Sequence, residues 1–260
     1  MRRIGVREQI SNRSDLIVGL TGIAVLGAVW CFLTYGSFVS AAFLPTPTGM
    51  WKGLVNFHQR DWLIPAILRS FRRVTLSLFL VVLVGVPIGV LMGCFTPIDA
   101  FLRKIVSGAK SVPTTGLMGL IIVWFSIEER AKIVFLFIGA IFYMIILVKN
   151  AVLKVPEAYI RVALDLGATR LQVIWRVILP GAMPQMWEAI AVCNGIMWTY
   201  IVLAEFINSN EEQLGLGYLL FIGSRTQDSG KVFAALTVIA VISSGTDYGL
   251  QWIRRRFLDW

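Results

Sequence analysis

The sequence predicts an all-α membrane protein of about six transmembrane helices, and its composition carries that prediction. Of its 260 residues, 57% are hydrophobic and only 15% are charged, whereas a soluble domain has about 25% charged residues. The mean hydropathy of +0.75 is too high for a water-soluble fold, because a soluble chain needs enough polar residues to form its surface. The same composition excludes a disordered chain, and three cysteines are too few for a disulfide scaffold.

The net charge of +9 has a different meaning in a membrane protein than in a soluble one. In a soluble chain it would suggest a nucleic-acid partner. In a polytopic membrane protein it indicates basic loops on the cytoplasmic side. We therefore expect the lipid bilayer, and no nucleic acid, among the partners.

Stretches without Lys, Arg, Asp or Glu mark the expected spans, since a transmembrane helix needs about 20 mostly apolar residues. The first span is expected at residues 16–43, because Pro45 and Pro47 break the helix that precedes them. Five more spans are expected within a core of residues 74–253. They are residues 74–98, 111–127, 133–148, 189–204 and 232–246.

The positive-inside rule predicts that both termini are cytoplasmic. The N-terminal segment 1–15 is rich in arginine, and six crossings return the chain to the same side at its basic tail, residues 254–260. The outer-side segment 44–73 departs from the rule, because it ends in three arginines. Two interpretations stay open: a vestibule that concentrates an anionic solute, or a helix end that binds lipid phosphates. The three are Arg69, Arg72 and Arg73.

The longest cytoplasmic loop, residues 149–185, carries clear helix signals. Pro156 suits a helix start, and Gly167 suits a helix end with positive φ. Thr169 can cap a second helix, which is expected to stop before Pro180. The loop should therefore form two short helices joined at a glycine.

Both short helices are expected to have an apolar face. Val162 and Leu166 are four residues apart, as are Leu171 and Trp175, and such pairs lie on one side of a helix. From the residues alone, two functions remain equally open. The hairpin is either a docking element for a partner or an interfacial element on lipid headgroups.

The loop resembles the cytoplasmic loop of ABC-importer permeases, which has the form Glu-Ala-Ala, three residues, Gly, and later Ile and Leu-Pro. Two positions depart from that form, since Arg161 occupies the Glu position and Val162 the first Ala position. The matching positions are Ala163, Gly167, Ala168, Ile178, Leu179 and Pro180.

Four further segments resemble the nitrate, sulfonate, taurine and bicarbonate branch of these permeases. This resemblance covers most of the chain beyond residue 43, up to about its last thirty residues. It identifies the family more specifically than the solute. The segments are residues 44–51, 70–93, 111–133 and 203–220.

The resemblance implies a type I ABC importer permease fold with a cytoplasmic coupling helix, in a bacterial inner membrane. Two copies of the permease would form the pathway, two ATPase subunits holding ATP and Mg would grip the loop, and an external binding protein would deliver the solute. The solute would be a small anion such as nitrate, a sulfonate, taurine or bicarbonate, or alternatively a neutral heterocycle or vitamin precursor. The implied coupling residues are Arg161, Val162, Ala163, Asp165, Leu166, Gly167 and Ala168, and Leu179 and Pro180 end the loop.

The chain itself is not expected to be an enzyme. It lacks the Gly-x₄-Gly-Lys-Ser/Thr sequence with which a loop cradles phosphates, so ATP hydrolysis is assigned to the partner. His58 is the only histidine, which leaves no second histidine for a metal site or catalytic triad. A secondary transporter, driven by an ion gradient, would leave the docking loop unexplained.

Three polar residues in or beside the fifth span are candidates for the solute pathway: Asn194, Thr199 and Glu205. An ionisable residue within a membrane span is a functional candidate, because its burial in lipid is costly. The alternatives are helix–helix hydrogen bonding for Asn194 and Thr199 and an interfacial carboxylate for Glu205.

Overall fold

The computed structural model describes residues 12–60, 62–206 and 214–258, and within them the regular elements are helices. Apolar composition, proline at helix starts and the scarcity of charges account for these elements. In chain order they are α1 (Asn12–Tyr35), α2 (Pro47–Gln59), α3 (Leu63–Cys94), α4 (Thr96–Lys110), η1 (Thr114–Leu117), α5 (Met118–Phe125), α6 (Glu129–Leu153), α7 (Glu157–Asp165), α8 (Arg170–Val173), η2 (Ile174–Ile178), α9 (Leu179–Phe206), α10 (Leu216–Arg225) and α11 (Ser229–Phe257).

The described helices confirm the all-α membrane fold. Five are long and apolar enough to cross a membrane: α1, α3, α6, α9 with its preceding turns, and α11. The expected third span is not one straight helix. Instead α4 is followed by η1 and α5 at a bend of 83°, and this pair brings the count to six if it forms a single span.

Two expected boundaries need correction. The first span ends at Tyr35 and not at residue 43, because Ser37 has a φ of 58° directly after Gly36 and turns the chain away from the helix. The segment expected to join the first two spans is helical from Leu63, where α3 begins. All three arginines of the expected vestibule, Arg69, Arg72 and Arg73, therefore lie in the first three turns of this 32-residue helix.

Close packing of α3 on α6 forms the centre of the core. Gly85, Gly89 and Gly93 line one side of α3, and a side chain there would overlap α6: a Cβ on Gly89 would lie 2.7 Å from the Cβ of Val148. Small residues at four-residue spacing allow helix backbones to approach closely in membranes. α6 also packs against α9, where Cys193 and Met197 are fully buried.

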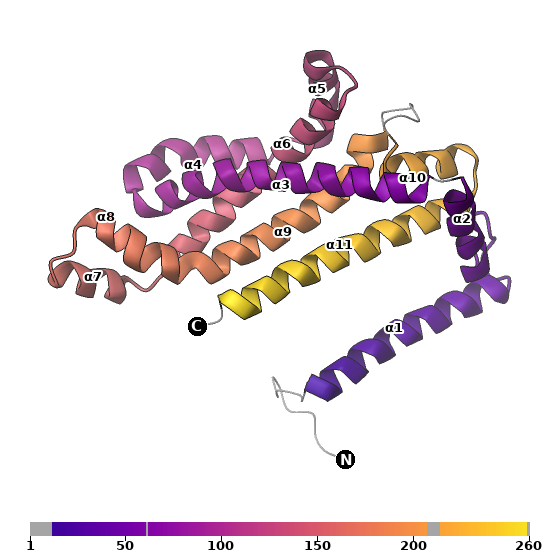
Figure 1. Cartoon of the computed structure of the whole chain (residues 1–260), viewed down its shortest axis with the longest axis horizontal. Helices are drawn as coiled ribbons and strands as arrows, with labels where there is room; N and C mark the ends of the chain where they lie inside the picture. Colours follow the sequence, from indigo (N-terminus) through magenta and orange to yellow (C-terminus); the bar gives the residue numbers. More distant parts are fainter. Residues whose placement is uncertain (1–11, 61, 207–213, 259–260) are drawn as a thin grey trace.

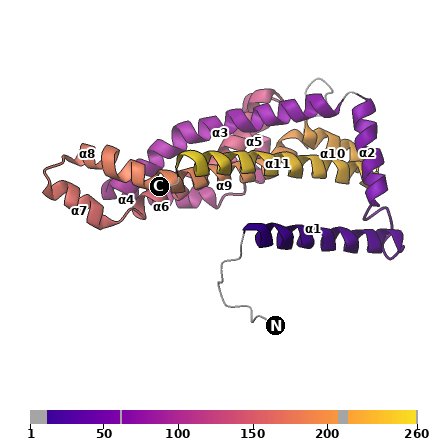
Figure 2. The ribbon, with the colours of Figure 1, turned by 60° about the horizontal axis from the view of Figure 1, so that its bottom comes forward.

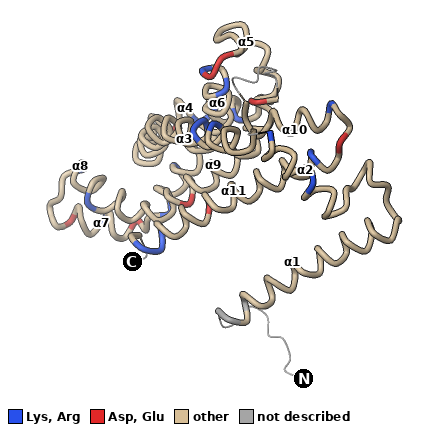
Figure 3. Tube along the Cα trace, turned by 45° about the vertical axis from the view of Figure 1, so that its right-hand side comes forward, with Lys and Arg blue, Asp and Glu red and all other residues tan. Residues whose placement is uncertain are grey.

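The bundle is elongated, with different helices at its two ends (Figure 1). α7 and α8 project at one end, here called the α7 end, where α11 also finishes. α2 and α10 lie at the opposite end, here called the α10 end. There α2 packs against α11 through Gly53 and Gly230, whose backbones nearly touch. Charged residues gather in a few groups and leave long helical stretches uncharged (Figure 3).

Helix α1 stands apart from the bundle in both ribbon views (Figures 1 and 2). Its most apolar 18-residue window, within Leu16–Tyr35, contains no buried residue. Its junction with α2 is nevertheless ordered locally, since the indole Nε1 of Trp30 donates to the carbonyl of Pro45 at 3.0 Å. Thr46 caps α2: its hydroxyl accepts from the Gly49 amide at 3.0 Å, which leaves Pro47 at the first helical position.

Candidate functional site

The hairpin formed by α7 and α8 is built by local hydrogen bonds, as the sequence predicts. Gly167 has a φ of +85°. Its amide donates to Leu164 at 2.9 Å and the Ala168 amide donates to Ala163 at 3.0 Å, the two bonds of a Schellman helix end. Thr169 and Gln172 form a reciprocal capping box at the start of α8. The turn between the two helices is therefore well defined.

The structure corrects the end of this loop. The second short helix does not stop before Pro180, because α8 passes through a π-helical turn, Ile174–Ile178, directly into α9. Pro180 lacks an amide hydrogen and disrupts an α-helix interior. Here it stands at the second position of α9, just after the π turn, and the chain runs as one continuous helical segment from Arg170 to Phe206.

The hairpin exposes most of the predicted coupling residues. Leu166 is 84% exposed and Val162 is 57% exposed, although both are apolar, while Ala163 and Ala168 are half-buried. Arg161 donates to Glu157 at 2.8 Å, but both side chains are more than two-thirds exposed, so this pair adds little stability. The chain thus places an apolar surface beside a positive charge at the tip of the α7 end.

Glu205, a predicted pathway residue, is instead 99% buried in an ion-pair network at the α10 end. Its carboxylate accepts from Ser70 at 2.7 Å, Arg73 at 2.6 Å and the Gly217 amide at 2.8 Å. Ser70 also accepts from the Leu216 amide at 2.9 Å. The first two amides of α10 are therefore held by side chains from α9 and α3, which fixes the position of α10.

The predicted vestibule arginines have separate environments. Arg73 has a fully buried side chain that pairs with Glu205 and with Glu129 of α6, so it is not an exposed vestibule cation; its carboxylate partners neutralise it. Arg72 stays largely exposed, 3.5 Å from Glu129. Arg69 is half-buried and its guanidinium lies 3.4 Å from the Leu214 carbonyl. The vestibule remains a prediction only for Arg69 and Arg72.

The other two predicted pathway residues also differ from each other. Asn194 is buried and its amide donates to Thr246 of α11 at 3.0 Å, which matches the helix-packing alternative. Thr199 lies on the exposed face of α9, with its hydroxyl bonded to the carbonyl of Gly195. Of the three candidates, only Thr199 faces away from the core.

Sequence reasoning missed several polar residues that the fold brings together. Glu129 and Lys132 of α6 belong to the Arg73–Glu205 network, and Ser70 precedes Arg73 by three residues on one face of α3. That i, i+3 spacing was a usable signal. No group of three or more His, Cys, Asp or Glu residues suited to a metal is found in the part of the chain that the structure describes.

A helical membrane bundle with a capped, exposed hairpin between its fourth and fifth spans has the architecture of a type I ABC importer permease. The chain belongs to that class: residues 85–259 match the family of binding-protein-dependent transport system inner membrane components.

The individual relatives include permeases for sulfonates. The chain is 32% identical to the taurine transport system permease protein TauC of Escherichia coli, over all of this chain and 94% of that protein. It is 30% identical to a putative aliphatic sulfonates transport permease of Bacillus subtilis, over 96% of this chain and 89% of that protein. The chain is thus an ABC importer permease of the nitrate, sulfonate and taurine branch.

Solved structures show the same fold. The MetNI methionine ABC transporter superposes with a TM-score of 0.65 at 22% identity, covering 75% of this chain and 95% of that one. A bacterial ABC transporter that imports the polysaccharide alginate superposes with a TM-score of 0.61 at 18% identity, covering 95% and 98%.

Proposed function

We propose that two copies of this permease form a membrane pathway for a small anionic solute, driven by a separate ATPase that docks on the α7–α8 hairpin. The exposed hairpin carries the proposal. A leucine that is 84% exposed at a well-defined turn indicates a contact surface, because such apolar exposure at a rigid element favours burial against a partner.

The ATPase would receive the hairpin in a groove and would supply the ATP and Mg. Val162 and Leu166 would provide apolar contact area, and the Schellman turn at Gly167 would keep α7 at a constant angle to α8. Since α8 continues into α9 through the π turn, motion of the docked hairpin would pass directly to a membrane-spanning helix. Arg161 would contact an acidic residue of the groove, in place of the usual glutamate contact.

A second copy of the chain is supported by the surfaces that one copy leaves open. α9 exposes polar residues toward one side, whereas the apolar window of α1 is suited to lipid. In a homodimer the polar side of α9 would face the partner or a shared pathway. The polar residues would then avoid lipid, where ionisable groups are costly.

The solute class is inferred from the relatives, whose names specify taurine and aliphatic sulfonates. An external binding protein would deliver the solute at the α10 end, and the α7 end would face the cytoplasm of a bacterial cell, with both termini there. A neutral heterocyclic solute is the alternative. Parallel uptake assays with taurine and with a thiamine-precursor pyrimidine separate the two.

Co-purification of the permease with its ATPase tests the docking proposal. Leu166→Ser should weaken ATPase capture and remove binding-protein-stimulated ATP hydrolysis. Leu68→Ser, at a leucine of α3 that is 62% exposed and lies at the α10 end, is the matched control and should leave both unchanged. Equal capture by the two variants would contradict the proposal. Uptake by the permease alone, driven by an ion gradient, would show a secondary transporter instead.

A further inference from the structure

Two pockets adjoin on the surface of α9 in the half of the bundle nearer the α7 end. They have volumes of about 480 and 530 Å³ and share Glu188 and Val192 as lining residues. The first lies between α6 and α9, and the second between α9 and α11. Together they form one open groove, called here the α9 groove, that belongs to neither the hairpin nor the Arg73–Glu205 network.

One stripe of α9 forms the floor of this groove and continues beyond it. Glu188, Val192 and Gly195 line the two pockets, and Thr199 follows one turn further along. The spacings of four, three and four residues place these residues on one helix face. Residues on the opposite face, such as Cys193 and Met197, are fully buried. The stripe extends from the α7 end toward the middle of α9, and it includes the one predicted pathway residue that is exposed.

The groove is polar although membrane-spanning helices form it. Ser243, Ser244 and Asp247 line it from α11, and Asn150 and Lys154 line it from the end of α6. Among the five candidate spans, α9 and α11 are also the two least apolar. Because ionisable side chains in the hydrocarbon of the bilayer are costly, this face is suited to water, protein or lipid headgroups.

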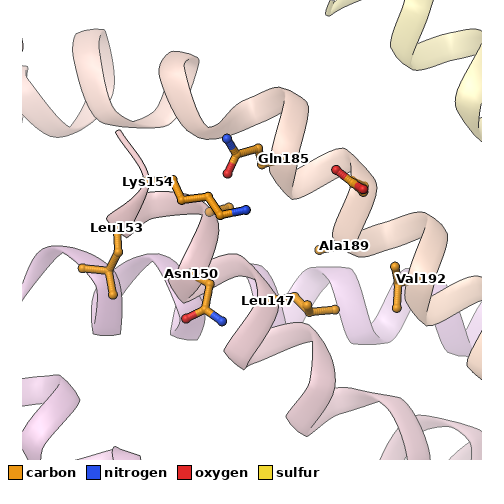
Figure 4. Close-up of a pocket in the computed structure, with 9 residues that line it drawn as sticks. Leu147, Asn150, Leu153, Lys154, Gln185, Ala189 and Val192 are labelled. Carbon is orange, nitrogen blue, oxygen red and sulfur yellow. The ribbon is translucent and has the colours of Figure 1, made fainter. Parts of the chain in front are cut away.

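Two cations, Lys154 and Arg254, and two carboxylates, Glu188 and Asp247, line the groove, and Lys154 is the cation that has no ion pair among the described residues. Glu188 lies 3.8 Å from Arg254, and Asp247 accepts from Gln251 at 2.9 Å. Lys154 lines the first pocket, and no ion pair of its ammonium group occurs within residues 12–60, 62–206 and 214–258. Figure 4 shows its side chain extending from the end of α6 into the space beside Gln185 of α9. The side-chain oxygen of Gln185 is buried there without a protein donor.

We propose that the α9 groove is the section of the solute pathway nearest the α7 end, and that Lys154 contacts the anionic group of the passing solute. This inference rests on the proposed function, since two grooves must face each other across the two copies of the permease to enclose a pathway. The proposal therefore assigns the pathway to the stripe of α9 that ends at Thr199, and not to the buried residues Asn194 and Glu205.

Thiol labelling tests whether the groove holds water, without any need for the natural solute. In the assembled complex with Cys31, Cys94 and Cys193 replaced, Val192→Cys should react with both an anionic sulfonatoethyl and a cationic trimethylammonioethyl methanethiosulfonate. It should do so in at least one of the nucleotide-free and vanadate-trapped states. Leu83→Cys, exposed on α3, is the lipid-facing control and should stay unlabelled. Protection of Val192→Cys in both states would overturn the proposal and indicate a buried contact between copies.

The charge of the labelling reagent tests the role of Lys154. Adding Lys154→Gln to Val192→Cys should slow the anionic reagent about twofold and speed the cationic one about twofold. Their rate ratio should therefore change roughly fourfold, the effect of one unit charge about 10 Å away in water. Lys104→Gln, at an exposed lysine of α4 outside the groove, should change neither rate. Equal slowing of both reagents by Lys154→Gln would contradict the proposed contact between Lys154 and an anionic group.

Transport separates this inference from the proposed function. Labelling of Val192→Cys should abolish ATP-driven taurine uptake. If the unlabelled complex transports taurine and labelling leaves uptake unchanged, the groove is not the pathway while the importer function stands. If the unlabelled complex transports none of taurine, nitrate and the pyrimidine, the proposed solute classes are wrong. The labelling rates of the two reagents still decide whether the groove is an aqueous passage that attracts anions.

Discussion

Replacing Glu205 by glutamine should destabilise the folded permease far more than the same change at Glu188. Glu205 is 99% buried and holds Arg73, Ser70 and the first turn of α10, whereas the side chain of Glu188 is 64% exposed and lies 3.8 Å from its partner. Removing one partner of a buried ion pair costs about 3–5 kcal/mol. We expect the lower end, about 3 kcal/mol, because Arg73 keeps Glu129 and glutamine retains one acceptor oxygen.

The free energy of unfolding in mixed detergent micelles measures this difference. Glu188→Gln should change it by less than about 0.5 kcal/mol, as for other exposed pairs. In a double-mutant cycle with Arg73→Met, the two changes should couple by about 1–3 kcal/mol. Equal destabilisation by Glu205→Gln and Glu188→Gln, or a coupling near zero, would refute the assignment of Glu205 to a structural network.

Three further predictions concern the α3–α6 packing and the α7–α8 hairpin, each with its measurement. Gly89→Ala should lower the unfolding free energy by at least about 1 kcal/mol, because its Cβ would press on Val148. The control Gly108→Ala, where the structure leaves open space, should raise the unfolding free energy by about 0.5–1 kcal/mol. Equal effects of the two substitutions would contradict the α3–α6 packing. Gly167→Ala, at a φ of +85°, should cost about 1–2 kcal/mol and reduce ATPase capture in pull-down assays; unchanged capture would count against a rigid turn. Thr169→Ala should remove the capping box and cost about 1 kcal/mol, with Thr169→Ser restoring stability.

Local chemistry made much of the fold predictable from the sequence. Uncharged stretches predicted where membrane helices lie, because the cost of charge in lipid acts on each segment separately. The turn at Gly167 and the cap at Thr169 were also predictable, since a helix end depends on the few residues around it. The same reasoning failed at Pro180, because the π turn that accommodates it depends on how the whole segment from Arg170 onward packs.

The functional roles of polar residues were less predictable. Glu205 and Arg73 lie far apart in the sequence. Considered separately, Arg73 was predicted to be an exposed vestibule cation and Glu205 a residue of the solute pathway. Only the packing of α3 against α9 brings them within 2.6 Å and makes them structural partners. The same packing decides which side of α9 is covered by the core and which side forms the open groove.

The sequence by itself determined the class of protein, most of the spans and the turn of the α7–α8 hairpin, whereas the tertiary structure decided which charges are buried and which face is open. Hydropathy and capping depend on neighbours within one or two helical turns. Burial and ion pairing depend on the three-dimensional arrangement of several helices, because a charge is stabilised only by the groups that the folded chain brings next to it.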